Sequence, residues 1–308
     1  MFMGELNPSI ATASKPKRKR IKVTVGDLLI WLVMLLAMVI VLYPVLKIVA
    51  GSFSNSELLL RGEVGIVPNG FTLKNYMSLF SNSSLWKAYG YTILYTVVST
   101  IASLFFTLSC AYPLSKRTFV GRRKWNFVLM FTMLFSGGLI PTFMLNTQIF
   151  PFMNTMIPFT ISGCVGAWNV VLARTFFEGI PQGLEESAKI DGANDLIILL
   201  KIYLPLSKPI IATLGLFAAV GAWNNYFGPM VYMNDMDRWP VALLLRQWLF
   251  VDSSTSVTTG SSIGDAYAIP QIARNYTAIV VTMLPIICVY PFVQKYFVKG
   301  LMVGAVKG

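Results

Sequence analysis

Histidine is absent from this chain of 308 residues. Without an imidazole, the chain lacks the commonest general base of enzymes and the commonest protein ligand of metal ions. Charged residues are also scarce: they make up 12% of the chain, against about 25% in soluble domains. Apolar residues make up 55% and gather in repeated long runs. This composition indicates an all-α membrane protein that crosses the bilayer several times.

Cysteine occurs only three times, at Cys110, Cys164 and Cys288, each time inside an apolar run. An odd number excludes a framework of fully paired disulfides, and the spacing fits no metal site. We therefore interpret the cysteines as small apolar residues and expect no metal in this chain.

Motifs that carry chemistry are missing as well. No G-x-x-x-x-G-K-[ST] phosphate loop occurs, so the chain lacks the usual motif that binds ATP. No G-x-S-x-G or H-E-x-x-H motif occurs either. All thirteen Asp and Glu residues lie in loops or at the ends of apolar runs, whereas ion-coupled carriers usually need acids within the membrane. These absences argue against hydrolases and secondary transporters.

The apolar runs predict six transmembrane helices in one membrane domain over residues 24–308, preceded by a basic arm at 1–23. A polar stretch at 178–209 separates the fourth span from the fifth, and a tail follows at 294–308. The six spans are predicted at about residues 28–47, 91–114, 127–149, 157–177, 210–233 and 276–293.

Three features modify this simple pattern of spans. Gly137-Gly138 and Pro141 interrupt the third span and predict a kink or a broken helix there. The apolar stretch 239–250 is too short to cross a bilayer, so we expect an interfacial or re-entrant helix. Residues 252–264 are rich in Ser, Thr and Gly and predict irregular structure.

Basic residues indicate the orientation. Eighteen of the 25 Lys and Arg residues lie at 1–23, 115–125, 174–208 and 294–308, and seven lie in the segments on the other side. The positive-inside rule then places both termini and the 178–209 stretch in the cytoplasm. This distribution also explains the net charge of +12 without a nucleic-acid partner. Because the first apolar core is longer than that of a signal peptide, we expect an uncleaved first span, although Ala50-Gly51-Ser52 resembles a cleavage site.

The 178–209 stretch predicts a helical hairpin at the membrane surface. Pro181 suits the first turn of a helix that runs through Lys189. Asp191-Gly192 predicts a turn, with Asp191 as cap of a second helix from Ala193 to about Tyr203. Pro205 and Pro209 are expected to end that second helix.

The same stretch resembles the EAA loop of ATP-binding-cassette importer permeases. The matching residues are Glu186-Ser187-Ala188, then Gly192 after three residues, then Ile202-x-Leu204-Pro205 after nine. Ile190-Asp191-Gly192-Ala193 resembles the carbohydrate-uptake branch, as do segments of the 51–87 loop and the C-terminal tail. The alternative is an ordinary amphipathic interfacial helix whose acids face water.

This resemblance implies a fold, partners and site residues. The fold would be the type I importer permease fold of six transmembrane helices with a cytoplasmic coupling helix, in a bacterial-type cell membrane. The partners would be a second permease in a heterodimer, two ATPase subunits that bind ATP and Mg²⁺, an external sugar-binding protein and membrane lipid. The residues expected to couple to the ATPase are Glu185, Glu186, Ala188, Asp191, Gly192, Ile202, Leu204 and Pro205.

A substrate pathway is suggested by amides beside aromatic rings within the fourth and fifth spans. The residues are Asn169, Trp223, Asn224, Asn225 and Tyr226. Amides bond sugar hydroxyls and rings stack on sugar C–H surfaces, and buried amides are costly unless satisfied. Helix packing, with Asn as interhelical glue, is the alternative that we favour for these residues.

Three other functions stay open at this point. An importer permease for a non-sugar solute would share the coupling loop. A membrane-embedded transferase should show paired acids or a histidine at the end of a span, but the only adjacent acids here, Glu185-Glu186, lie in the coupling loop. A membrane scaffold would not associate with an ATPase.

Overall fold

The computed structural model describes residues 24–255 and 270–305, and all regular structure in these ranges is helical. The basic arm at 1–23, the stretch 256–264 and the last three residues of the tail lie outside the described residues. The chain divides into two units, residues 1–46 and 47–308, and each is considered by itself.

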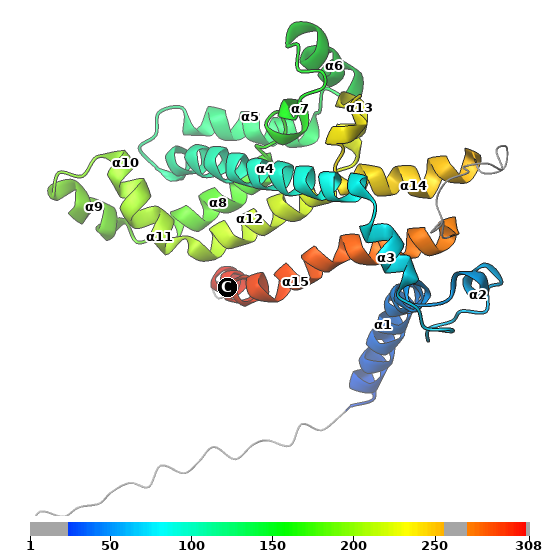
Figure 1. Cartoon of the computed structure of the whole chain (residues 1–308). Coiled ribbons are helices and arrows are strands. Elements are labelled where there is room, and N and C mark those ends of the chain that lie inside the picture. The colour runs from blue at the N-terminus through cyan, green and yellow to red at the C-terminus, as the bar shows by residue number, and fades with distance from the viewer. Residues whose placement is uncertain (1–23, 256–269, 306–308) are drawn as a thin grey trace, which may run out of the picture. The chain divides into compact units, whose positions relative to one another are not determined.

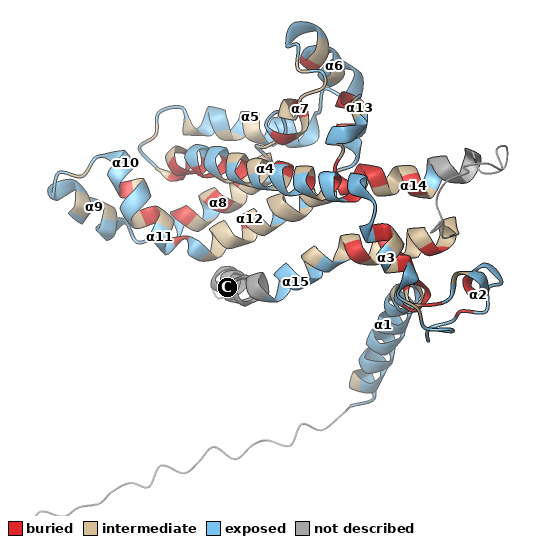
Figure 2. Ribbon diagram, in the orientation of Figure 1, coloured by how far each residue is buried: buried red, intermediate tan, exposed pale blue. Residues whose placement is uncertain are grey.

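The first unit consists, in its described part, of most of helix α1 (Val25–Ser52). No residue from 24 to 46 is buried, and Figure 2 colours this stretch as largely exposed. The helix contains the predicted first span and is uniformly apolar around its axis rather than amphipathic. A helix that is apolar all round needs a nonpolar surrounding, which a lipid bilayer supplies.

The second unit is built on α4 (Ser83–Ser115), which packs against α12 (Lys208–Trp223) and α8 (Ala167–Glu178) (Figure 1). Asn82 caps α4 by accepting a hydrogen bond from the amide of Ser84 at 2.9 Å. The helix contains the predicted second span and forms the axis on which the other elements are placed.

The third predicted span is broken, as the Gly-Gly-x-x-Pro sequence indicated. Helix α5 (Arg122–Leu134) is followed by α6 (Leu139–Met144) and by the π-helical η1 (Leu145–Ile149). The two halves meet at 111°, and Gly138 takes a φ of +82° at the bend. Only glycine adopts that conformation at low cost, so the predicted interruption is confirmed.

The prediction of a continuous fourth span at 157–177 is wrong. A single turn, α7 (Ile157–Thr160), is separated from α8 by an irregular segment, and Gly166 occupies the N-cap of α8. The segment contains Ser162-Gly163, which weakens a helix because of backbone entropy and competing side-chain bonds. Hydropathy alone could not reveal this break.

The fifth predicted span is also shorter than expected. Helix α12 ends at Trp223, and a separate turn, α13 (Phe227–Tyr232), follows a three-residue break. The sixth span belongs to α15 (Gln271–Ala305), which begins five residues before the predicted start and runs through the described part of the tail. Helix α14 (Val241–Thr255) confirms the short apolar helix expected near 239–250, and makes residues 252–255 helical rather than irregular.

The count of six single spans is not reproduced in the described residues. Three helices are long and apolar enough to cross a membrane, namely α1, α4 and the 271–291 part of α15. Two bent pairs reach the same threshold together: 122–134 with 139–149, and 195–206 with 208–223.

Three apolar clusters hold the second unit together, and Figure 2 shows buried residues along α4 and α8. The first joins α4, α8 and α12 to the 178–209 hairpin. The second joins α3 (Lys74–Phe80), α4, α14 and α15. The third joins α2 (Ser56–Leu60) and the end of α1 beyond Leu46 to α15.

Candidate functional site

The hairpin at 178–209 begins with α9 (Gln182–Ile190), whose N-cap is Pro181. This helix confirms the first predicted helix to within a residue at either end. The turn that follows places Gly192 at a φ of +80°, where a side chain would be strained. The amide of Ala193 then donates to the carbonyl of Ala188 at 2.9 Å, which closes the first arm.

The second arm comprises α10 (Asp195–Ile198), the π-helical η2 (Leu199–Tyr203) and α11 (Leu204–Leu206). The predicted cap, Asp191, is wrong. Asn194 caps the arm, because its side-chain oxygen accepts from the amide of Ile197 at 2.9 Å. The turn at Gly192 separates Asp191 from the start of α10, so Asp191 is too far along the chain to be its N-cap.

Pro205 does not end the second arm, contrary to prediction. It lies in α11, directly after the π-helical η2, in which the amide of Leu204 donates to the carbonyl of Leu199. Proline lacks the amide that an α-helix needs at this point, and a local π turn re-routes the hydrogen bonds around it. The arm ends instead at Ser207, where the chain bends by 83° into α12.

The carboxylate of Glu185 fastens α9 to the rest of the unit. It accepts from Tyr203 Oη at 3.0 Å and from Lys189 Nζ at 2.8 Å, and it forms an ion pair with Lys116 at the end of α4. The side chains of Glu185 and Lys116 are each 13% exposed. We call these four residues, Lys116, Glu185, Lys189 and Tyr203, the latch.

The pKa values in the latch show which force governs each group. Burial alone would raise the pKa of Glu185, but bonds from Lys116, Lys189 and Tyr203 outweigh it and lower the pKa to about 2. Burial lowers the pKa of Lys116 even though Glu185 opposes this shift. The hydrogen bond to Glu185 raises the pKa of Lys189. Near neutral pH the latch is therefore a charged network rather than a neutral one.

Aromatic rings enclose the ammonium group of Lys116. It lies 4.3 Å from the ring centre of Tyr112 and 3.9 Å from that of Tyr203. The two rings meet edge to face at 5.1 Å, and Tyr203 meets Phe177 of α8 in the same way at 5.5 Å. Cation–π contacts stabilise a lysine that has left water, so α4 and both arms meet at Lys116, and α8 packs against one of the rings that enclose it.

A polar pocket of about 360 Å³ opens beside the latch. Its wall includes Glu186 and a second ion pair, between Arg122 and Glu178. The guanidinium of Arg122 also donates to the carbonyl of Leu114 at 2.9 Å, which ties the 116–121 loop to α4. The loop that sequence analysis used only as an orientation signal therefore supplies part of the site.

The expected coupling residues divide into two faces. Glu185, Ala188, Ile202 and Leu204 are partly buried, and the last three pack against the apolar cluster of α4, α8 and α12. Glu186, Asp191, Gly192 and Pro205 are exposed. Large apolar side chains accompany the exposed set: Ile190 is 87% exposed, and Leu184, Leu196, Ile197 and Leu200 are also exposed. A soluble hairpin rarely displays so much apolar surface unless a partner covers it.

The predicted pathway residues lie elsewhere, mostly at the break after α12. Asn224 donates to the carbonyl of Val220 at 2.9 Å, and Asn225 accepts from the amide of Gly228 at 3.0 Å. Trp223 packs against Tyr89 and donates to the carbonyl of Thr282 at 3.4 Å, while Tyr226 is 43% exposed. Both amides thus serve the broken backbone, a role that a continuous helix would not have required.

Asn169 lies apart from that break, in the first turn of α8. Its side chain is partly buried and lies against Gly166 at the N-cap. The sequence Val-Gly-Ala-Trp-Asn occurs at 165–169 and again at 220–224, and the two copies lie at opposite ends of their helices, one at the start of α8 and one at the end of α12.

Sequence analysis missed a buried polar cluster at residues 52–76, which we call the knot. Asn75 is fully buried and donates to the carbonyls of Ser52 at 3.2 Å and Ser54 at 3.0 Å. Its oxygen accepts from the hydroxyl of Ser56 at 2.9 Å. The hydroxyl of Ser52 bonds that of Tyr76 at 2.8 Å. The Ser-x-Ser spacing before an Asn-Tyr pair was the available signal.

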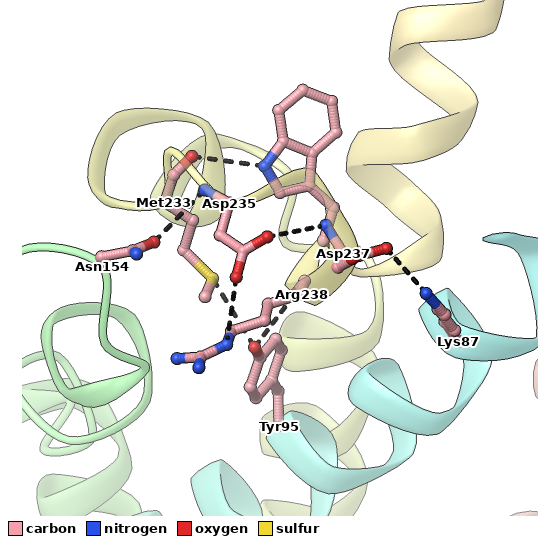
Figure 3. Close-up of polar contacts among 8 residues, drawn as sticks. Lys87, Tyr95, Asn154, Met233, Asp235, Asp237 and Arg238 are labelled. Atoms are coloured by element: carbon pink, nitrogen blue, oxygen red, sulfur yellow. Dashed lines mark hydrogen bonds and ion pairs between the residues drawn. The ribbon is translucent and has the colours of Figure 1, made fainter.

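A second polar cluster shapes the turn between α13 and α14, which contains the short helix η3 (Met236–Arg238) (Figure 3). Tyr95 of α4 donates to the carbonyl of Arg238 at 2.9 Å. Lys87 pairs with Asp237 at 2.9 Å, and Arg238 pairs with Asp235 at 3.2 Å. The turn is thereby joined to the start of α4, far along that helix from the latch.

Comparison with protein families gives one match over nearly the whole chain. The model described as "Binding-protein-dependent transport system inner membrane component" matches residues 29–303. That range includes the hairpin, the latch and the break after α12.

Curated relatives match over similar lengths. The polygalacturonan/rhamnogalacturonan transport system permease protein YtcP of Bacillus subtilis is 39% identical over 282 residues, which are 92% of this chain and 98% of the relative. Protein LplC of the same organism is 40% identical over 269 residues, 87% of this chain and 90% of the relative.

A solved structure is similar as well. It is described as a bacterial ABC transporter involved in the import of the acidic polysaccharide alginate. The matched chain is 33% identical with a TM-score of 0.78, and the match covers 90% of this chain and 99% of that one.

Proposed function

This chain belongs to the family of binding-protein-dependent transport system inner membrane components, and on that premise we propose that it is a permease subunit of an ATP-driven sugar or oligosaccharide importer. The family assignment confirms the resemblance found in the 178–209 stretch. The observation that carries the proposal is the hairpin, whose exposed face is apolar and acidic while its other face is fastened to α4 and α8.

Acidic oligosaccharides are the substrates that we propose to test first. The name of the relative at 39% identity contains polygalacturonan and rhamnogalacturonan, and the description of the similar structure names alginate. Those descriptions name polymers that contain sugar acids. Two matches of this quality over nine tenths of the chain support an anionic sugar substrate more than a neutral one.

The two adjacent acids of the hairpin have different roles in this proposal. Successive residues of a helix point about 100° apart, so Glu185 faces α4 while Glu186 faces outward. Glu186, Ile190, Leu196 and Leu200 would form the surface that meets the ATPase. Glu185 would transmit movement of that surface through Lys116 to α4.

The transport cycle follows from this division of roles. The hairpin lies in the cytoplasm, where two ATPase subunits bind ATP and Mg²⁺, and a second permease completes the pathway in a heterodimer. Closure of the ATPase pair moves the hairpin, and the latch carries that movement to α4 while Tyr203 carries it to α8. An external binding protein delivers the sugar, and ATP and loaded binding protein favour the same state.

Glu186→Arg tests the proposed docking surface. We expect the variant to insert normally but to lose its ATPase in detergent, since loss of one partner of a desolvated charge pair costs about 2–5 kcal/mol. Co-purification of the ATPase and sugar uptake are the measurements. Glu63→Arg, which reverses an exposed acid outside the hairpin, is the matched control. Unchanged retention of the ATPase by Glu186→Arg would contradict the docking surface.

Uptake itself tests the proposed substrate class. Cells that express the complete importer should accumulate oligogalacturonates, and deletion of this chain should abolish that accumulation. A neutral oligosaccharide of the same length serves as the competitor. If only the neutral sugar enters, the importer stands but the acidic class is wrong; if no sugar enters, the sugar proposal is wrong.

A further inference from the structure

Helix α14 carries one basic residue in a mostly apolar stretch. From Val241 to Phe250 the only charged side chain is that of Arg246. Leu244 and Trp248 are buried against α4 and α15. At about 100° per residue, Arg246 points some 160° away from both, on the opposite face of the helix. A cation in that setting is expensive unless something compensates it, and it is a candidate for function.

An aromatic ring lies beside this cation. The guanidinium carbon of Arg246 is 5.6 Å from the ring centre of Tyr226, within the range of a cation–π contact. Tyr226 follows the end of α12 directly, next to Asn224 and Asn225, and 43% of it is exposed. The break in α12 therefore brings amides, an aromatic face and a guanidinium into one neighbourhood.

The acids nearest to Arg246 on its N-terminal side are already paired with other cations. Asp235 and Asp237 are the only acids between residues 223 and 250, and Figure 3 shows them paired with Arg238 and Lys87. Among the described residues no ion pair involves Arg246. Arg238 and Lys87 thus each have a carboxylate partner, whereas no carboxylate in the described part of the chain pairs with Arg246.

We propose that Arg246 and Tyr226 form a subsite that binds the carboxylate-bearing ring of an acidic sugar as it passes through the permease. A guanidinium presents two parallel N–H donors that match the two oxygens of a carboxylate. The exposed face of Tyr226 offers a flat surface for the C–H side of the sugar ring. This inference rests on the proposed importer function and assigns its selectivity to two residues of this chain.

Comparison of two substrates that differ only in charge tests the subsite. Methyl esterification removes the charge of an oligogalacturonate and leaves its sugar rings and length unchanged. In cells expressing the complete importer, Arg246→Gln should lower uptake of the free acid about tenfold or more, because the variant loses the charge-assisted bond to the carboxylate. Uptake of the methyl ester should stay the same. The readout is the ratio of the rate of free-acid uptake to the rate of methyl-ester uptake.

Two further variants make the result specific. Arg238→Gln removes a nearby guanidinium that is already paired with Asp235, and it should leave the ratio unchanged. Arg246→Lys keeps the charge without the planar fork, and it should restore part of the acid uptake. All rates are normalised to the amount of folded permease in the membrane.

The outcomes separate this inference from the function on which it rests. A ratio that falls in Arg246→Gln but not in Arg238→Gln supports the subsite. Equal loss of both substrates in Arg246→Gln would overturn it and make Arg246 a structural residue. Normal transport of both substrates by that variant would overturn it while leaving the importer intact. If the unmodified importer takes up neither substrate, the substrate class itself fails and the subsite fails with it.

Discussion

The knot at 52–76 and the latch of the hairpin solve the same problem in opposite ways. Both hold a polar segment in place: the latch joins the hairpin to α4, and the knot joins the two ends of the 52–76 segment to each other. The knot does so with neutral amides and hydroxyls, and its central Asn75 is fully buried with both ends of its side chain bonded. The latch does so with charges at the tips of long side chains, and its central carboxylate keeps some exposure.

This difference teaches which attachment is static and which can move. Each bond of the knot involves a short side chain. Asn75 alone bonds Ser52, Ser54 and Ser56, so displacement of Asn75 would break three bonds at once. The latch is made by long flexible side chains, and an ion pair can lengthen or exchange a partner without unfolding a helix. We infer that the hairpin is built to shift against α4, while the 52–76 segment is built to stay.

Breaking the latch should have the largest effect. Glu185→Gln leaves Lys116 largely buried without its carboxylate, which costs about 2–5 kcal/mol. Even about 2 kcal/mol shifts an equilibrium roughly thirtyfold. We expect the ATPase to stay bound and to hydrolyse ATP while sugar uptake per ATP falls by at least tenfold, as measured in proteoliposomes.

Removing both charges should undo part of that loss. In Glu185→Gln combined with Lys116→Met, no buried charge is left alone, and such replacements are often close to neutral. Lys87→Met, which breaks the exposed pair with Asp237, should leave the coupling ratio unchanged. A normal ratio in the single Glu185 variant would mean that the latch does not carry movement.

Breaking the knot should lower stability but not coupling. Asn75→Ala leaves buried carbonyls and a hydroxyl without partners, each costing about 1–3 kcal/mol. Asn75→Asp should be worse, because a carboxylate keeps the shape but cannot donate to the two carbonyls. The melting temperature should fall for both, with sugar uptake per ATP unchanged in the folded fraction. A coupling defect at full stability would show that the comparison is wrong.

Lowering the pH changes no residue, and it should release the latch but not the knot. The pKa of Glu185 is lowered from 4.5 to about 2, so its contribution is complete above about pH 4.5 and is lost as the pH falls toward 2. Protease cleavage of the hairpin should therefore stay constant from pH 8 to 5 and rise below pH 4.5. No carboxylate takes part in the hydrogen bonds of the knot, so cleavage at 52–76 should not change, and Glu185→Gln should remove the acid transition in the hairpin.

The sequence predicted the local features of the hairpin well and its contacts poorly. The first helix and the glycine turn follow from short-range rules at Pro181 and Gly192, and the structure agrees with both. The two adjacent acids look equivalent in sequence. Only the position of Glu185 three residues before Ala188, on the same helix face, hinted that it points inward.

Long-range effects explain the remaining differences. Pro205 stays within the second arm because a π turn precedes it, and no propensity rule anticipates that compensation. The break at Asn224 and Asn225 interrupts an apolar run that hydropathy reads as continuous. Both cases involve backbone hydrogen bonds that are satisfied in an unusual way, which composition does not reveal.

The bend at Ser207 makes the second arm and α12 the two limbs of a crank. The arm from Asp195 to Leu206 is about 18 Å long and α12 about 24 Å, at 1.5 Å per residue. If the pair turns as one piece about Ser207, a stroke of ~3 Å at Asp195 becomes ~4 Å near Trp223. Because the limbs meet at 83°, Asp195 and Trp223 would move in nearly perpendicular directions. A force applied to the hairpin therefore need not point in the direction in which Trp223 moves.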